Sequence, residues 1–122
     1  MEVAVALGGC PGVVEASVYG VSVPGEDGRA GMAAVTVSGD FHLAALHAAV
    51  TTRLPAYARP LFLRIVASFA RTETLKQKKT ALAAEGFDPT IVSDPLYIDR
   101  DGAYRPLDAE VYAAIGSVEI QL

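Results

Sequence analysis

The sequence contains no tryptophan, one cysteine and two histidines among its 122 residues, and these scarcities exclude several kinds of site. With Cys10 alone, no intrachain disulfide can form, which fits a protein of the reducing cytosol. His42 and His47 are five residues apart on one predicted helix and therefore on different faces, so a zinc site is not expected. A basic excess is missing too. Ten Lys and Arg stand against fourteen Asp and Glu, for a net charge of −4, the opposite of what nucleic-acid binding usually requires.

Long apolar runs and the usual nucleotide-binding signatures are also absent. No stretch approaches the ~20 apolar residues that a helix needs to span a bilayer, and the N-terminus lacks the basic-then-apolar pattern of a secretory signal. Residues 25–31 have glycines three apart but match neither a dinucleotide-binding loop nor a P-loop, so they indicate an ordinary turn. No serine lies in a Gly-x-Ser-x-Gly elbow. We therefore expect a cytoplasmic location.

What the chain does contain is typical of one soluble globular domain: 52% of its residues are apolar and 20% are charged. Residues 2–7 resemble the last turns of a helix that has no N-cap, so we expect its beginning to lie outside this chain. β-rich stretches at 13–21 and 31–37, with a polar, glycine-rich loop between them, predict a hairpin.

The middle of the chain predicts a helix over 41–54 with Asp40 as its N-cap, because apolar residues recur there on one helical face. These apolar residues are Leu43, Leu46, Val50 and Leu54. Residues 60–66 predict a third, largely buried strand, and residues 77–85 a short helix ended by Gly86.

The tail predicts a hairpin over 96–105 around an Asp-Gly step, a helix over 109–115 capped by Asp108, and an edge strand over 118–122. Together these elements predict an α+β fold. Strands 13–21, 31–37 and 60–66 would form a small three-stranded core sheet flanked by helices. The tail would add a hairpin-helix-strand extension that extends or flanks that core.

The cysteine and the histidines are not expected to form a site, whereas the lysines are clustered. Cys10 has no basic residue nearby in the sequence, so we interpret it as a buried small hydrophobe, and both histidines as surface residues. The chain's three lysines, Lys76, Lys78 and Lys79, lie within four residues of one another in an otherwise acidic protein.

The lysine segment breaks a local rule of helix electrostatics. Lys78 and Lys79 fall in the first turn of the predicted helix and Glu85 in its last turn, so every charge opposes the helix macrodipole at a cost of ~0.3–1 kcal/mol each. Either these residues are a solvated polar face, or the lysines and the helix N-terminus form an anion site. The residues alone leave both interpretations open.

Longer motifs resemble the C-terminal domain of the adenylate-forming enzymes. Residues 54–60 read Leu-Pro-Ala-Tyr-Ala-Arg-Pro, and after the buried strand residues 72–76 read Thr-Glu-Thr-Leu-Lys. The superfamily carries a Thr-x-Ser/Thr-x-Lys loop near its C-terminus, whose lysine aligns with Lys76. Residues 18–34, 54–64, 85–89 and 94–97 are more specifically similar to the fatty acid transport protein group, the very-long-chain acyl-CoA synthetases.

This sequence departs from that group at two places. Glu73 and Leu75 stand where the group usually has glycine and phenylalanine, and Glu73 brings a negative charge close to the lysine. The group also has a hinge and a glycine-containing loop before the first helix, and the chain starts just past that point.

The resemblance implies that residues 1–122 are the small, mobile C-terminal domain of an ATP-dependent fatty acyl-CoA ligase whose large N-terminal domain is absent. Such enzymes make an acyl-adenylate from ATP and a fatty acid with Mg²⁺, and coenzyme A then displaces AMP. Lys76 would be the adenylation lysine, and Lys78 and Lys79 would contact anions. The fragment alone is expected to be inactive and to hold no cofactor, with any membrane association coming from the missing part. The alternative is a stand-alone α/β binding or regulatory module without catalysis.

Overall fold

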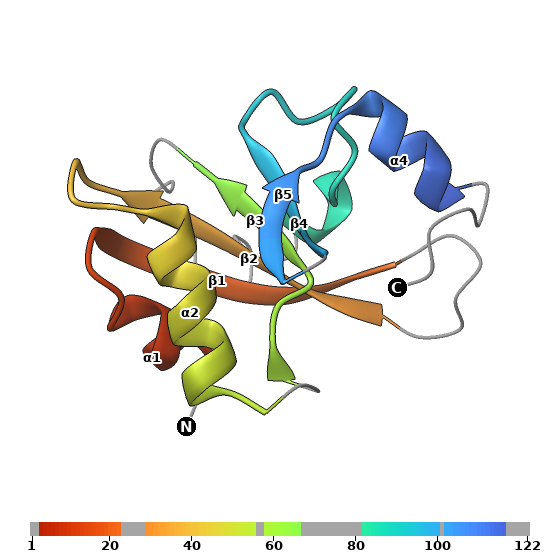
Figure 1. Cartoon of the computed structure of the whole chain (residues 1–122). Helices are drawn as coiled ribbons and strands as arrows, with labels where there is room; N and C mark the ends of the chain where they lie inside the picture. The colour runs from red at the N-terminus through yellow and green to blue at the C-terminus, as the bar shows by residue number, and fades with distance from the viewer. Residues whose placement is uncertain (1–2, 23–28, 56–57, 67–81, 101, 117–122) are drawn as a thin grey trace.

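A computed structural model describes residues 3–22, 29–55, 58–66, 82–100 and 102–116 (Figure 1). Five strands form one sheet in the order β1-β2-β3-β4-β5. In chain order the elements are α1 (Val3–Gly8), β1 (Val13–Ser22), β2 (Arg29–Val37), α2 (Leu43–Arg53), β3 (Phe62–Ile65), β4 (Leu96–Arg100), β5 (Ala103–Pro106) and α4 (Ala109–Gly116). The α+β class predicted from the sequence is confirmed.

The first two strands form the predicted hairpin. β1 pairs with β2 antiparallel from Val13↔Val37 to Ser22↔Arg29, with a register shift between Val13 and Glu15. At this irregularity the Glu15 amide donates to Thr36 Oγ1 at 3.0 Å, so the shifted backbone keeps a partner.

Helix α2 connects β2 to β3, which lie parallel to each other from Met32↔Phe62 to Val35↔Ile65. Parallel neighbours need a crossover, and the helix supplies it. Leu46 and Val50 are buried as the periodicity predicts. The predicted N-cap is wrong. α2 starts at Leu43 after His42, with no side-chain cap, because Asp40 lies in a turn that the Phe41 amide closes onto Ser38 O at 3.1 Å.

The tail hairpin continues the core sheet. β4 pairs antiparallel with β3 from Phe62↔Ile98 to Arg64↔Leu96, and β5 pairs with β4 across a turn at Gly102, whose φ is 79°. The result is one mixed five-stranded sheet, so of the two arrangements left open by the sequence the tail hairpin extends the core and does not merely flank it.

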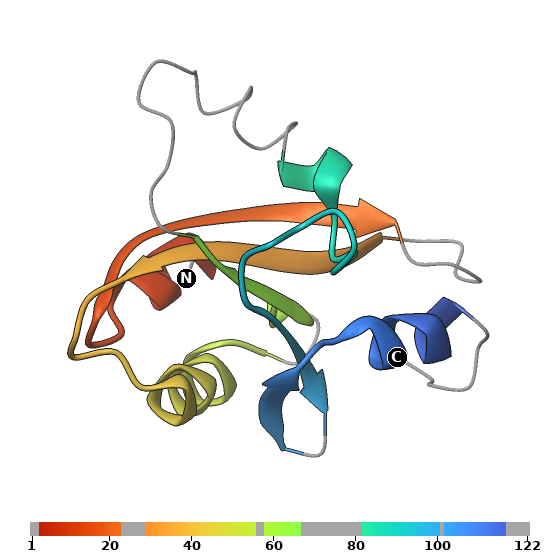
Figure 2. The same ribbon diagram turned by 90° about the horizontal axis from the view of Figure 1, so that it is seen from above.

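Each face of the sheet carries its own apolar cluster. Helices α1 and α2 cover one face, and the helical turn at 82–85 lies over the other (Figure 2). The first cluster, on the face of the 82–85 turn, contains Tyr19, Val21, Met32, Ala34, Phe62, Val66, Phe87, Val92, Leu96, Ile98 and Leu107. The second cluster, under α1 and α2, contains Ala6, Leu7, Cys10, Ala33, Val35, Leu46, Val50, Leu54, Leu63 and Tyr104.

The C-terminal elements complete the first cluster. Val111 and Tyr112 of α4 pack against it, and the Tyr112 ring meets Phe87 at 5.4 Å between centroids. The predicted cap holds: the Val111 amide donates to Asp108 Oδ1 at 2.9 Å. The predicted strand at 118–122 lies outside the described residues. Across the described ranges, no helix has both the length and the apolar character to cross a membrane.

Candidate functional site

The three lysines predicted from the sequence, Lys76, Lys78 and Lys79, lie outside the described residues. The structure does describe the residues on either side of their segment, up to Val66 before it and from Leu82 after it. On one side, the Val66 amide extends the β2–β3 pairing by donating to Val35 O at 2.9 Å. On the other side, Leu82 and Ala83 pack against the first cluster, to which Val66 also belongs.

The helical turn at 82–85 ends as predicted. The Gly86 amide donates to Leu82 O at 3.0 Å, and Gly86 has a φ of 62°, a left-handed conformation that glycine adopts without strain. Val66 and Leu82, the described residues on either side of 67–81, therefore lie on the same face of the sheet.

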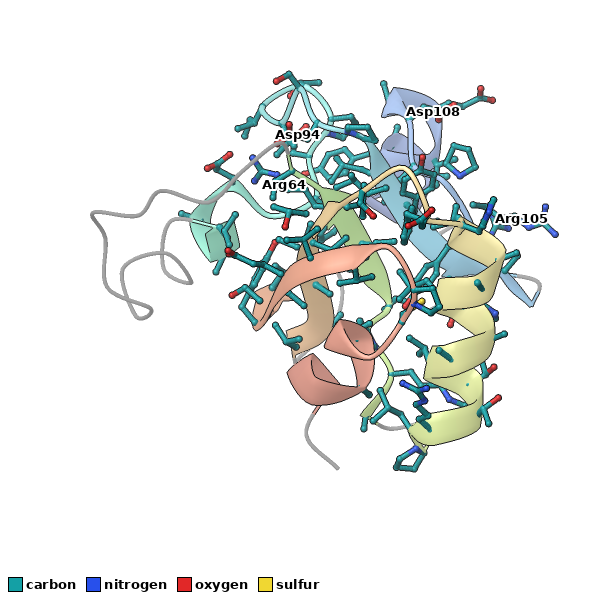
Figure 3. All side chains as sticks on the ribbon, turned by 90° about the vertical axis from the view of Figure 1, so that its left-hand side faces the viewer. Arg64, Asp94, Arg105 and Asp108 are labelled. Carbon is teal, nitrogen blue, oxygen red and sulfur yellow. The ribbon has the colours of Figure 1, made fainter. Side chains whose placement is uncertain are left out.

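Arg64 of β3 forms ion pairs with two acids on this face, and Figure 3 shows it beside one of them, Asp94. Its Nε donates to Asp94 Oδ2 at 2.9 Å, and its Nη2 lies 2.8 Å from the same oxygen. Its Nη1 lies 3.0 Å from Glu85 Oε2, an ion pair without hydrogen-bond geometry. We call Arg64, Glu85 and Asp94 the Arg64 cluster. The cluster joins the strand that leads into the lysine segment to the helical turn that follows it.

The guanidinium of the Arg64 cluster is mostly withdrawn from water, since Arg64 is only 8% exposed. Burial works to lower the pKa of Arg64, but the hydrogen bond to Asp94 and the charge of Glu85 outweigh it, so the pKa lies above its ordinary value. The guanidinium therefore keeps its charge, and the two carboxylates lie close enough to balance it.

The Arg64 cluster explains why a negative charge is tolerated at the end of a helix. Glu85 stands in a last turn, where the macrodipole disfavours an acid, yet its carboxylate faces a buried cation at 3.0 Å. The unfavourable charge predicted from the sequence is compensated by a tertiary contact.

Two hydroxyl groups without a hydrogen-bond partner in the described structure lie on strand β1, on this same face of the sheet. Ser17, Ala34 and Arg64 are aligned across β1, β2 and β3, and Tyr19 follows two residues along β1. Ser17 Oγ and Tyr19 OH are buried and make no hydrogen bond within the described structure. Burial raises the pKa of Tyr19, and the nearby Arg64 charge opposes the shift only in part.

The remaining polar candidates lie on the opposite face. Cys10 is buried as predicted, and burial raises the pKa of its thiol even though Arg53 works against the shift. His42 is exposed, as predicted. The prediction of a surface position is wrong for His47, whose side chain is only 13% exposed and whose Nε2 lies 2.9 Å from Asp99 Oδ1. Asp99 comes from β4, which the sequence could not place beside α2. Within the described ranges, no three His, Cys, Asp or Glu side chains could share a metal ion.

Arg59, in the 54–60 motif, has a structural role. Its Nε donates to Leu54 O at 3.0 Å and its Nη2 to Thr51 O at 2.8 Å, which satisfies carbonyl groups at the end of α2.

Arg64 and Asp94 were missed by the sequence reasoning, although the sequence held a signal for the first. Arg64 is the one charged residue in the apolar stretch 60–66, and an arginine in a buried strand needs an acidic partner. The partners lie 21 and 30 residues further on, since 85 − 64 = 21 and 94 − 64 = 30, so spacing could not identify them.

Residues 2–76 match the family described as AMP-binding enzyme C-terminal domain. The chain belongs to this family. The match covers more than half of the 122 residues and reaches as far as Lys76.

Curated relatives extend the similarity over the whole chain. The mouse long-chain fatty acid transport protein 3 is 49% identical over 112 residues, which cover 88% of this chain and 17% of that protein. The mouse long-chain fatty acid transport protein 6 is 46% identical over 125 residues, covering 99% of this chain and 20% of that protein. The chain thus spans at most about a fifth of the length of these relatives.

A solved structure has the same fold. The fatty acyl CoA synthetase of Mycobacterium tuberculosis superposes with a TM-score of 0.56 at 22% identity, covering 68% of this chain and 17% of that one.

Proposed function

We propose that this chain works as the small, mobile C-terminal domain of an ATP-dependent fatty acyl-CoA ligase. The observation that carries the proposal is the family match, which covers residues 2–76 and ends at Lys76. The similarity to long-chain fatty acid transport proteins supports a fatty acid as the substrate.

The proposed reaction has two steps. A fatty acid carboxylate first attacks the α-phosphate of ATP, giving an acyl-adenylate and pyrophosphate. The thiol of coenzyme A then attacks the acyl carbon and releases AMP. A large domain outside this chain would bind ATP, Mg²⁺ and the acyl chain.

Lys76 is the proposed adenylation residue of this domain. The first step brings two anions together, and a cation between them offsets their repulsion and stabilises the charge that develops in the transition state. Lysine suits this position because its ammonium is a compact charge on a long, flexible stem. In the second step the nucleophile is a thiol, so the same cation is no longer required.

Lys78 and Lys79 are proposed to contact anions as well. Their position at the start of a predicted helix makes them unfavourable for the helix itself, which is more readily explained by a partner than by stability. Coenzyme A phosphates or acidic groups of the large domain would provide such a partner.

An assay for pyrophosphate release tests the proposal. The isolated chain, given ATP, Mg²⁺, palmitate and coenzyme A, should release no pyrophosphate above background, whereas the full-length protein should form palmitoyl-CoA. Turnover by the isolated chain at an ordinary enzymatic rate, ~1 per second or faster, would contradict the division of labour. A full-length protein that binds fatty acid or nucleotide without forming the thioester would favour the binding-module alternative.

A further inference from the structure

We infer that the face of the sheet that carries the first cluster has a phosphate-binding site, which the Glu85 side chain closes. Three buried donors form the site: the hydroxyl groups of Ser17 and Tyr19, and Nη1 of Arg64. The inference does not rest on the proposed function, because the ligase reaction assigns no step to these residues. All of them lie within the described ranges.

The three donors are buried, yet none makes a hydrogen bond within the described structure. Ser17 is 6% exposed, and Tyr19 and Arg64 are each 8% exposed. Among the described residues, their Oγ, OH and Nη1 atoms are the buried side-chain polar atoms that lack a partner. A buried donor without an acceptor lowers stability, and the large majority of such groups in folded proteins have a partner. Three of them on one face therefore indicate a ligand with acceptor oxygen atoms.

The register of the sheet brings these donors onto one small area of the face. Ser17 pairs with Ala34, and Ala34 pairs with Arg64, so the three residues are aligned across β1, β2 and β3. About 10 Å separate β1 from β3, which long side chains can bridge above the methyl group of Ala34. Burial raises the pKa of Tyr19, Arg64 lowers it and Glu85 raises it, so both charges act on this phenol.

Glu85 is the displaceable member of the Arg64 cluster. Asp94 Oδ2 accepts from Nε of Arg64 at 2.9 Å and lies 2.8 Å from Nη2, so this acid orients the guanidinium. Glu85 Oε2 lies 3.0 Å from Nη1 without hydrogen-bond geometry, and its side chain is 40% exposed, against 29% for Asp94. Glu85 therefore balances charge without satisfying the donor. Its side chain can turn toward water and leave Nη1 to another acceptor.

The free donors fit a phosphate group better than a carboxylate. A carboxylate binds arginine best through two parallel N–H groups, and Asp94 already occupies the edge of the Arg64 guanidinium that carries Nε and Nη2. What is left is one nitrogen and two hydroxyl groups on different strands, which suit the tetrahedral oxygen atoms of phosphate. With Glu85 turned away, the charges of Arg64 and Asp94 cancel, so a phosphate anion meets no net negative charge.

A titration of the chain with inorganic phosphate tests the site. At constant ionic strength, the backbone amide NMR signals of Ser17, Tyr19 and Arg64 should shift and saturate, whereas acetate should leave them unchanged. Tyr19→Phe should raise the Kd for phosphate about 10-fold, because it removes one hydrogen bond to a charged group. Ser17→Ala should act in the same direction. Both variants should stay folded, since neither hydroxyl group has a partner in the described structure.

Matched variants separate the site from general effects of charge and packing. Tyr104→Phe makes the same substitution on the opposite face, where the hydroxyl group donates to Pro60 O at 2.8 Å, and should leave the Kd unchanged. Glu85→Gln should lower the Kd about 5-fold or more, because it removes a like charge close to the bound anion. Glu110→Gln changes the net charge equally at an exposed position on α4 and should leave the Kd unchanged.

The inference is overturned if phosphate gives no saturable shift in either the wild type or Glu85→Gln. It is also overturned if Tyr104→Phe weakens phosphate binding as much as Tyr19→Phe does. Equal Kd values for Glu85→Gln and the wild type would contradict the closing role of Glu85.

Discussion

Two buried tyrosines, one in each apolar cluster, differ in whether the hydroxyl group has a hydrogen-bond partner. Tyr104 OH donates to Pro60 O at 2.8 Å, whereas Tyr19 OH makes no hydrogen bond within the described structure. Burial raises the pKa of both phenols, so both stay neutral at ordinary pH. A buried hydroxyl group without a partner lowers stability, and one with a partner contributes to it.

This difference predicts opposite results for the same substitution. Tyr104→Phe should cost ~1–2 kcal/mol, because it leaves a buried carbonyl group unpaired, and should lower Tm by several degrees. Tyr19→Phe should leave Tm unchanged or raise it. Thermal unfolding of the two variants followed by circular dichroism makes the comparison, and a larger loss for Tyr19→Phe would show that its hydroxyl group has a partner after all.

At the residue scale, sequence reasoning detected unusual charges but not what compensates them. It recognised that Glu85 is unfavourable at a helix end, and the compensating cation proved to be Arg64 on another element. It assigned Asp40 as a cap, and that prediction was wrong because a local turn takes up the residue. Partners that depend on tertiary structure cannot be identified from spacing along the chain.

Among the elements, the connection between α1 and β1 is the one most tightly constrained by a glycine. Gly12 has a φ of 87°, and a Cβ there would come within 2.3 Å of the Phe41 backbone. The Ser38 amide also donates to Gly12 O at 2.7 Å. The connection thus packs directly against the turn that precedes α2.

We therefore expect Gly12→Ala to be destabilising. The left-handed conformation alone costs ~1–3 kcal/mol for a residue with a Cβ, and the contact with Phe41 adds to it, so Tm should fall by ~5 °C or more. Gly39→Ala is the matched control, since a Cβ there meets nothing within 4 Å. Equal Tm values for the two variants would contradict the close packing described here.

The elements themselves were largely predictable from local patterns. The strands at 13–21 and 31–37 and the helix at 109–115 were placed to within two residues by β-propensity, periodicity and capping. Strong local signals also identified the Asp-Gly turn of the β4–β5 hairpin. The turn before α2 was not predicted, because a backbone hydrogen bond from the Phe41 amide to Ser38 O closes it and side-chain patterns do not reveal such a bond.

At the scale of the whole molecule, the sequence predicted the strands of the core but left open whether the tail hairpin extends that sheet or flanks it. β4 meets β3 at Phe62↔Ile98, a pairing between residues 36 apart, since 98 − 62 = 36. Local propensity carries no information about such pairing. The continuity matters because the β3–β4 edge brings Leu96 beside Arg64 and places Asp94 within reach of its guanidinium.

The central claim is that Lys76 of this domain serves adenylation and not thioester formation, and the two half-reactions of the full-length protein test it most directly. Lys76→Ala should lower the rate of acyl-adenylate formation by ~10²-fold or more, the scale for losing one preorganised charge stabiliser. Thioester formation from supplied acyl-adenylate and coenzyme A should stay within a few-fold of wild type. Equal loss in both half-reactions would mean that Lys76 supports the structure of the domain, and full retention of both would mean that the catalytic lysine lies elsewhere.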